Sequence, residues 1–323
     1  MSPEDLRSFE KFNYLLRPSK QVERKLLIEA LHRLSSSGFP IRTYTYFGLG
    51  SIYYADFILF YKYLYMQKMI CVEGEPIPKR MEFNLPFPFI QLKMKRVSDV
   101  LPSLDRDEKY FAWLDYDNRL DDEAIRDISS LIQILAPGSV FLITVDADPR
   151  FHGLWDNEDS VERRDGMILA ELQRSWGRFC SMPIARKMLT PHGLPPLIAE
   201  VIRSVVNESA LARPDGLISF SQLFNFSYKD GAQMLSLGGM VCDPATKEKL
   251  EASRIESIDW INREQEPIRI SVPQLTVREK QWLDCRLTAS LGVDELAFEL
   301  DPDHLENYRR YQKHYPTYYE TLT

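Results

Sequence analysis

Between residues 41 and 148 the sequence alternates short strand-like runs with helical patterns, and this alternation restricts the fold more than any other feature. The runs are rich in apolar, β-branched and aromatic residues, as strands are: "IRTYTYF", "MICVEGE", "FIQLKMKRVSD", "YFAWLDYDN" and "SVFLITVDAD". Short connections and right-handed crossovers then favour a parallel sheet with helices on both faces. The last run is almost continuously apolar, which is typical of a strand buried on both sides.

Helical patterns flank this region, and a hairpin signal follows it. Residues 17 to 40 begin with Pro-Ser, place apolar residues at helical spacing and end in Ser-Ser-Ser-Gly, so they predict an amphipathic helix. Two further helical patterns fall within residues 150 to 215. After them, two strand-like runs meet at Lys229-Asp230-Gly231, where Asp-Gly predicts a hairpin between antiparallel strands.

The turn after the first run contains two glycines, Gly48 and Gly50, in "FGLGS". Glycine lets backbone approach a ligand closely, and the helix that follows offers free N–H groups and the positive end of its dipole. Glu73 ends "ICVE" within the second run, 23 residues after Gly50, near the roughly 20-residue spacing of an acid that accepts ribose hydroxyls. The same glycines also suit a plain tight turn, so both interpretations stand at this point.

In this order the motifs resemble those of the class I S-adenosylmethionine-dependent methyltransferases. That family has a glycine loop after the first strand, acids after the second and third, an acid-plus-aromatic stretch after the fourth, and a closing hairpin. The matching stretches here are "FGLGS", "CVEGE", "VSD", "LDYDN" and the hairpin around "YKDG", within residues 41 to 242. The resemblance implies an α/β fold with a Rossmann-like, mostly parallel seven-stranded sheet that ends in an antiparallel hairpin.

This fold divides the chain into five parts. An N-terminal helical segment (1–40) precedes the Rossmann-like cofactor-binding core (41–149). A helical insertion (150–215) separates this core from its closing antiparallel hairpin (216–245), and a C-terminal extension (246–323) follows.

The resemblance also implies S-adenosylmethionine as the cofactor. The residues expected to bind it are Tyr46, Gly48, Gly50, Ser51, Glu73, Asp99 and Asp115. Within this set Gly48 and Gly50 would line the methionine part of the cofactor. Glu73 would bind the ribose, Asp99 the adenine and Asp115 the cofactor amine or the substrate. The family often has an acid at the position of Tyr46, so this chain would hold the amino-acid end of the cofactor differently.

Catalysis is expected to involve Asp115, Tyr116 and Asp117, which would lie where the reacting group is placed. Methyl transfer by in-line displacement needs little covalent help, because holding the nucleophile in line supplies much of the rate. The expected function is therefore methyl transfer to an acceptor that the sequence does not name, with an oxygen nucleophile as the candidate. The alternative is a catalytically silent, methyltransferase-like subunit of a larger assembly, which binds a nucleotide or serves only as a scaffold.

Several carboxylates and one side-chain amide are predicted to crowd one rim of the sheet, and Mg²⁺ favours such oxygen clusters. The residues concerned are Asp115, Asp117, Asn118, Asp146 and Asp148. Asp121 and Asp122 nearby indicate that part of this acidity belongs to an ordinary loop and helix start. We therefore assign no metal ligands and keep Mg²⁺ as the less favoured alternative.

Two basic clusters and a tyrosine-rich tail bear on partners. Arg17, Lys20, Arg24 and Lys25 are expected on a solvated helix face, with anion binding as the alternative. Binding to nucleic acid is not favoured, since the net charge is −7. It would depend on basic residues of the insertion that share one face: Arg163, Arg164, Arg174, Arg178, Arg186 and Lys187. The tail could contact a protein partner or a second copy, or pack internally, through Tyr308, Tyr311, Tyr315, Tyr318 and Tyr319.

The cysteines and the hydropathy pattern indicate the compartment. The four cysteines lie far apart without a CxxC pair, as expected of reduced thiols in a cytoplasmic protein. The most apolar stretch, "YYADFILFYKYLYM", is interrupted by Asp56 and Lys62 and is too short to span a bilayer. The sequence thus predicts a cytoplasmic protein without a membrane segment.

Overall fold

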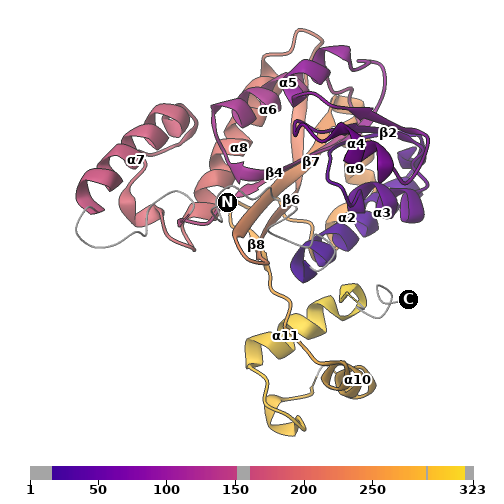
Figure 1. Ribbon diagram of the computed structural model, residues 1–323, viewed down its shortest axis with the longest axis vertical. Coiled ribbons are helices and arrows are strands. Elements are labelled where there is room, and N and C mark those ends of the chain that lie inside the picture. Colours follow the sequence, from indigo (N-terminus) through magenta and orange to yellow (C-terminus); the bar gives the residue numbers. More distant parts are fainter. Residues whose placement is uncertain (1–16, 151–160, 289, 317–323) are drawn as a thin grey trace.

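The structure, a computed structural model, describes residues 17–150, 161–288 and 290–316, with the side chains of residues 161–165 left out. Its centre is an eight-stranded sheet in the order β3-β2-β1-β4-β5-β7-β6-β8 (Figure 1). The strands are β1 (Thr45–Leu49), β2 (Lys68–Val72), β3 (Ile90–Lys93), β4 (Tyr110–Arg119), β5 (Val140–Asp146), β6 (Ser219–Lys229), β7 (Gln233–Cys242) and β8 (Ile268–Ile270).

The first five strands pair in parallel, whereas β7 is antiparallel to both β5 and β6. The predicted Rossmann-like sheet with a closing hairpin is therefore confirmed. The predicted number of seven strands is one too small, because β8 of the C-terminal extension pairs in parallel with β6. All residues of β5 are buried, as its continuous apolar pattern predicted.

Helices cover both faces of the sheet (Figure 1). The helices are α2 (Pro18–Ser36), α3 (Ala55–Leu64), α4 (Pro78–Phe83), α5 (Val97–Val100), α6 (Asp122–Ile134), α7 (Val161–Trp176), α8 (Leu194–Leu211), α9 (Pro244–Ala252), α10 (Val277–Arg286) and α11 (Pro302–Tyr311). One hydrophobic core lies under α5, α6 and α8, and the other lies under α2, α3 and α9. Of the two helices in the predicted insertion, α8 packs on the sheet beside α6, whereas α7 projects from the body (Figure 1).

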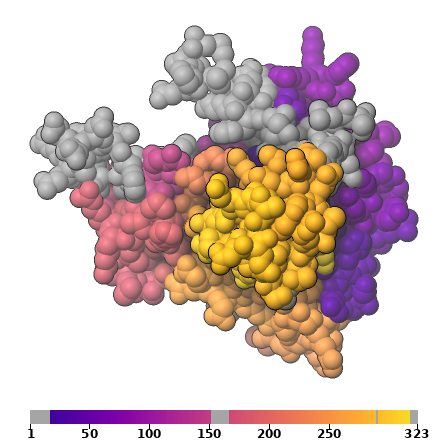
Figure 2. All heavy atoms as spheres, turned by 90° about the horizontal axis from the view of Figure 1, so that it is seen from below, coloured from indigo at the N-terminus to yellow at the C-terminus, as the bar shows by residue number. Residues whose placement is uncertain are grey.

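The C-terminal extension has a small core of its own beneath the main body (Figures 1 and 2). The predicted capping box is present, because Thr276 and Glu279 cap the start of α10 reciprocally. Tyr308, Tyr311 and Tyr315 are at most 6% exposed, so packing within the chain accounts for these three. Tyr318 and Tyr319 lie outside the described residues.

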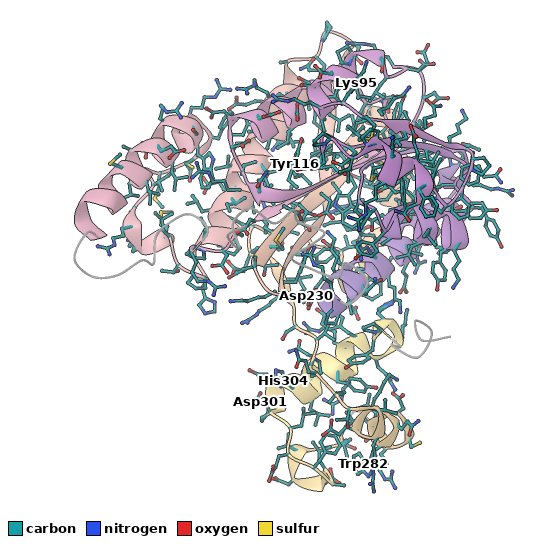
Figure 3. The ribbon with its side chains drawn as sticks, in the orientation of Figure 1. Lys95, Tyr116, Asp230, Trp282, Asp301 and His304 are labelled. Atoms are coloured by element: carbon teal, nitrogen blue, oxygen red, sulfur yellow. The ribbon has the colours of Figure 1, made fainter. Side chains whose placement is uncertain are left out.

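Asp230 connects the closing hairpin to the N-terminal helix. Its two carboxylate oxygens accept hydrogen bonds from the backbone N–H groups of Ser19 (3.0 Å) and Lys20 (2.9 Å) at the start of α2 (Figure 3). These N–H groups have no partner inside the helix, and a negative charge at this end interacts favourably with the positive end of the helix dipole. Because β6 runs parallel to β5, the turn after β6 lies at the edge where the parallel strands end, and it holds the start of α2 there.

Replacing Asp230 by Ala should lower the free energy of unfolding by about 1–2 kcal/mol, the usual range for a lost helix cap. Urea denaturation followed by circular dichroism measures this difference. The exposed Asp259, which makes no hydrogen bond to another described residue, serves as the matched control, and Asp259→Ala should change stability by less than about 0.5 kcal/mol. Equal effects of the two substitutions would contradict the capping role.

Candidate functional site

The candidate site lies at the edge of the sheet where the parallel strands end. There β1 lies between β2 and β4, with Gly48 opposite both Cys71 and Trp113. Gly48 belongs to the strand and not to the predicted turn, and a Cβ at this position would clash with the hydroxyl of Tyr46. Gly48 therefore makes room for Tyr46, which is 1% exposed and packs against aromatic rings of α3.

Gly50 is the glycine that forms the turn, and it brings Glu73 next to β1. A Cβ on Gly50 would lie 2.9 Å from Met81 Cε and 3.2 Å from Glu73 Cβ, closer than side chains normally approach. Gly50, Ser51 and Glu73 are half-buried, so this edge remains partly open. Burial raises the pKa of Glu73, against a 2.8 Å hydrogen bond that its Oε1 accepts from the backbone of Glu75.

Two of the predicted acids are not at strand ends. Asp99 was expected to close the third strand, but β3 ends at Lys93 and Asp99 is an exposed residue of α5. Asp115 was expected to close the fourth strand, but β4 continues to Arg119, with an irregular register after Asp115. The strand ends are set by the pairing partners: β3 stops where β2 stops, and β4 continues beside β5.

Asp115 forms a buried ion pair with the N-terminal helix. Lys20 Nζ lies 2.8 Å from Asp115 Oδ1 and 3.0 Å from Glu23 Oε2, and it donates a 3.0 Å hydrogen bond to the hydroxyl of Tyr228. The Lys20 side chain is fully buried, with Nζ 4.2 Å from the centre of the Trp113 ring. The Asp115 side chain is 18% exposed, so the pair reaches the open edge of the site.

The charges of this cluster determine its protonation. Burial opposes the charged form of Asp115, but Lys20 and then Arg17 outweigh it and lower the pKa of Asp115. Burial likewise opposes the charge on Lys20, yet Asp115 and Glu23 raise the pKa of its ammonium. Burial raises the pKa of Glu23, and Lys20 offsets this only in part. The cluster therefore holds an ionised Asp115 beside a permanently charged Lys20.

The other two predicted catalytic residues point in different directions. Tyr116 (labelled in Figure 3) donates a 2.7 Å hydrogen bond from its hydroxyl to Asp127 of α6. Helix α6 covers one core of the sheet, whereas α2, which carries Lys20, covers the other. Burial and then the Asp127 carboxylate raise the pKa of Tyr116. Asp117 is exposed, and its charge acts on Arg17 as that of Asp115 does. The structure thus places Asp115 and Asp117 near Arg17, whereas Tyr116 is bonded to α6.

Asp146 and Asp148 follow the neighbouring strand β5, and their pKa values differ strongly. Asp146 is 3% exposed, and burial raises its pKa to about 7. Hydrogen bonds from the Arg150 side chain, at 2.9 and 2.6 Å, lower the pKa of Asp148 to about 2. Two neighbouring carboxyls with separated pKa values can hold different protonation states near neutral pH.

The basic cluster of the N-terminal helix is the main residue set whose role sequence reasoning missed. The prediction of a solvated helix face is wrong for Lys20 and Arg24, which are buried and paired with Asp115 and Asp56. A signal was present, since Lys20 and Arg24 precede Leu27 and Leu31 at helical spacing on the apolar stripe. Charged residues on a buried stripe indicate buried partners.

The insertion gives little support to nucleic-acid binding, and the acidic rim gives little support to Mg²⁺ binding. Arg174 lies 3.3 Å from Asp122, and Arg178 lies over the ring of Phe179, while the side chains of Arg163 and Arg164 are outside the described residues. Asp121 caps the start of α6, as its loop setting suggested. Within residues 17–150, 161–288 and 290–316, no group of three or more His, Cys, Asp or Glu residues is arranged to hold a metal ion.

Comparison with known proteins identifies the family. Residues 12–323 match the profile of a family described as "Putative O-methyltransferase", so the chain belongs to this family. The match and the strand order confirm the predicted class, an S-adenosylmethionine-dependent methyltransferase with a Rossmann-like fold. No curated protein sequence matches the chain.

Solved structures give only distant likenesses. Trm1 from Pyrococcus horikoshii, solved with S-adenosyl-L-methionine, is 11% identical over 76% of this chain and 61% of its own, with a TM-score of 0.47. The N-methyltransferase NodS from Bradyrhizobium japonicum is 13% identical over 69% and 97% (TM-score 0.36). The O-methyltransferase TomG from Streptomyces achromogenes is 12% identical over 71% and 91% (TM-score 0.35). The chain spans less than two thirds of the Trm1 chain.

None of the helices in the described part of the chain combines the length and the apolar composition that crossing a bilayer requires.

The raised pKa of Asp146 predicts a pH-dependent effect of Asp146→Asn on stability. Between about pH 4 and pH 7 the unfolded chain ionises this carboxyl while the folded chain keeps its proton, so this group lowers stability as pH rises. Asp146→Asn should therefore gain stability relative to wild type by about 2–4 kcal/mol between pH 4 and pH 8.

Urea denaturation at both pH values measures this change. Asp148→Asn is the matched control: it should be less stable than wild type by a similar amount at pH 4 and at pH 8, because this carboxylate is ionised throughout that range. Its lowered pKa stabilises the fold above about pH 4, and this contribution is lost as pH falls toward 2. A pH-independent difference for Asp146→Asn would contradict the buried, protonated state.

Proposed function

We propose that this methyltransferase transfers the methyl group of S-adenosylmethionine to an oxygen acceptor at the edge formed by β1, β2 and β4. The observation that carries the proposal is the direct approach of Glu73 to the turn at Gly50, with Asp115 two residues beyond the Trp113 that pairs with β1. These positions match the ribose, methionine and amine contacts that the family resemblance implies. The family description supports the oxygen acceptor.

The residues present fit the cofactor. Gly50 lies at a half-buried edge and lets Glu73 approach closely, and Glu73 presents a carboxylate there for the two ribose hydroxyls. Asp115 supplies a partly exposed negative charge for the amine of the methionine part. When bound, the cofactor supplies an electrophilic methyl group on a sulfonium. The predicted adenine contact of Asp99 has less support, since that residue lies on α5, away from the end of β3.

The protein's own task is then to orient the acceptor and to take its proton. Asp117 is exposed and acts on Arg17 together with Asp115, and in this proposal it holds an acceptor hydroxyl. Asp146 lies near enough to Asp117 for the two charges to interact, and its pKa, raised to about 7 by burial, suits a base that works near neutral pH. Tyr116 has no part in this proposal, because its hydroxyl is bonded to Asp127 on the other face.

Isothermal titration with S-adenosylhomocysteine tests the cofactor site. Glu73→Gln should weaken binding at least tenfold, because hydrogen bonds to a charged carboxylate are worth about 1.5–3 kcal/mol. Glu75→Gln is the matched control, since this exposed residue lies two positions away, and it should bind like wild type. Unchanged binding by Glu73→Gln would contradict the ribose contact. A wild type that binds neither this ligand nor S-adenosylmethionine would favour the scaffold alternative.

The acceptor atom is tested by incubating the protein with methyl-labelled S-adenosylmethionine and matched panels of phenols and aromatic amines. Mass spectrometry of the products should show label on oxygen and not on nitrogen. Label found on the amines alone would contradict an oxygen acceptor.

We also propose a cytoplasmic location, which the four free cysteines support, because secreted proteins usually oxidise such thiols. A protein partner or a second copy remains a proposal for the C-terminal tail. It is restricted to the tail's outer surface, because Tyr308, Tyr311 and Tyr315 already pack inside the chain.

A further inference from the structure

We propose that Lys20 is a positioning residue for Asp115: it fixes one carboxylate oxygen and holds the charge, so that the other oxygen can bind the cofactor's amine. This inference rests on the proposed function, because it assumes that Asp115 contacts the amine. It extends the site to α2, which lies outside all the motifs that resemble the methyltransferase family.

The contacts show how firmly Lys20 is committed. An ammonium group has three protons, and Lys20 Nζ has three close oxygen neighbours, on Asp115, Glu23 and Tyr228, at 2.8, 3.0 and 3.0 Å. Its side chain is fully buried and lies over Trp113, so it has no room to turn to solvent. Lys20 itself therefore cannot bind a ligand without breaking one of these contacts.

Asp115 is engaged on one side only. Its Oδ1 is paired with Lys20, whereas Oδ2 has no hydrogen bond to any described residue. The Asp115 side chain is 18% exposed while that of Lys20 is not exposed at all, so Asp115 is the member of the ion pair that a ligand can reach. A carboxylate held in this way presents its second oxygen to a cationic group, which an α-amine is below about pH 8.

The position of Lys20 is fixed by the fold. Asp230 accepts hydrogen bonds from the backbone of Ser19 and Lys20, and it holds the start of α2 at the sheet edge. One helical turn later, Arg24 pairs with Asp56 of α3. Contacts on both sides of Lys20 therefore prevent α2 from sliding along the sheet, and they keep Nζ beside Asp115.

The charged groups around Asp115 explain why Lys20 is needed. Arg17, Lys20, Glu23 and Arg24 act on it from α2, and Tyr228 and Tyr46 face it from β6 and β1. Lys20 is the strongest of the cations that favour its charged form, while burial and the Glu23 carboxylate oppose that form. Without Lys20, Asp115 would more readily take up a proton and lose its attraction for an amine.

The test compares Lys20→Met with wild type by titration with S-adenosylhomocysteine and with 5′-methylthioadenosine, which lacks the amine and the carboxylate. At pH 7.5 we expect S-adenosylhomocysteine to bind at least tenfold more weakly, and 5′-methylthioadenosine to change less than twofold. The ratio of variant to wild-type dissociation constants should rise further as pH falls from 9 to 6. Using the ratio cancels the titration of the ligand's own amine.

Two further variants keep the test interpretable. Lys280→Met removes a lysine from another partly buried ion pair, Lys280–Asp284 in the C-terminal extension, and it should bind both ligands like wild type. If Lys20→Met does not fold, the same titrations use the double variant Lys20→Met with Glu23→Gln, which also removes the second buried carboxylate. Lys20→Arg keeps the charge and should lose less affinity than Lys20→Met.

The outcomes distinguish the role of Lys20 from the proposed contact between Asp115 and the cofactor's amine. Asp115→Asn should weaken S-adenosylhomocysteine binding in the same way, and if it does not, the amine contact itself is wrong. If Asp115→Asn weakens binding but Lys20→Met stays within twofold of wild type, only the role of Lys20 is overturned. An equal loss for both ligands, a loss independent of pH, or tighter binding by Lys20→Met would also overturn it.

Discussion

The parallel pairing of β1 between β2 and β4 is the constraint on which the rest of the site depends. Parallel strands end at the same edge of the sheet, so strand pairing alone brings together residues that are far apart in sequence. The register places Gly48 opposite Cys71 and Trp113, and the chain then reaches Gly50, Glu73 and Asp115 within two residues of these positions. The two glycines have different uses, since Gly48 makes room for Tyr46 and Gly50 lets Glu73 approach.

A second constraint is the ionic cluster that joins the N-terminal helix to this edge. Burying charges is costly, and such pairs persist only where several hydrogen bonds and opposite charges compensate them. Here Lys20, Asp115 and Glu23 share one buried region, and Arg24 with Asp56 forms a second pair one helical turn away. Hydrophobic residues could fill the same space, so the charges are better explained by the site they adjoin than by stability.

Much of the architecture could be predicted because it depends on local patterns. Alternating strand-like and helical segments determined the parallel core, and the continuous apolar run of residues 139–148 identified β5. The Asp-Gly pair marked the hairpin between β6 and β7, although Asp230 proved equally important as the cap of α2.

The site was less predictable because it depends on long-range pairing. Composition alone suggested that a strand would end at Asp99, but the length of β2 stops β3 at Lys93. Tyr116 looked like a site residue beside Asp115, yet strand alternation turns it toward Asp127. The contact of Lys20 with Asp115 spans 95 positions in sequence, so only the apolar stripe shared with Leu27 hinted at it.

A crystal structure of the protein with S-adenosylhomocysteine bound tests the proposed cofactor site most directly. The account predicts ribose hydroxyls within hydrogen-bonding distance of Glu73, backbone of the Gly50 turn beside the homocysteine part, and the amine against the outer oxygen of Asp115. A ligand bound elsewhere, or an adenosyl group at this edge that contacts neither Glu73 nor Asp115, would contradict it.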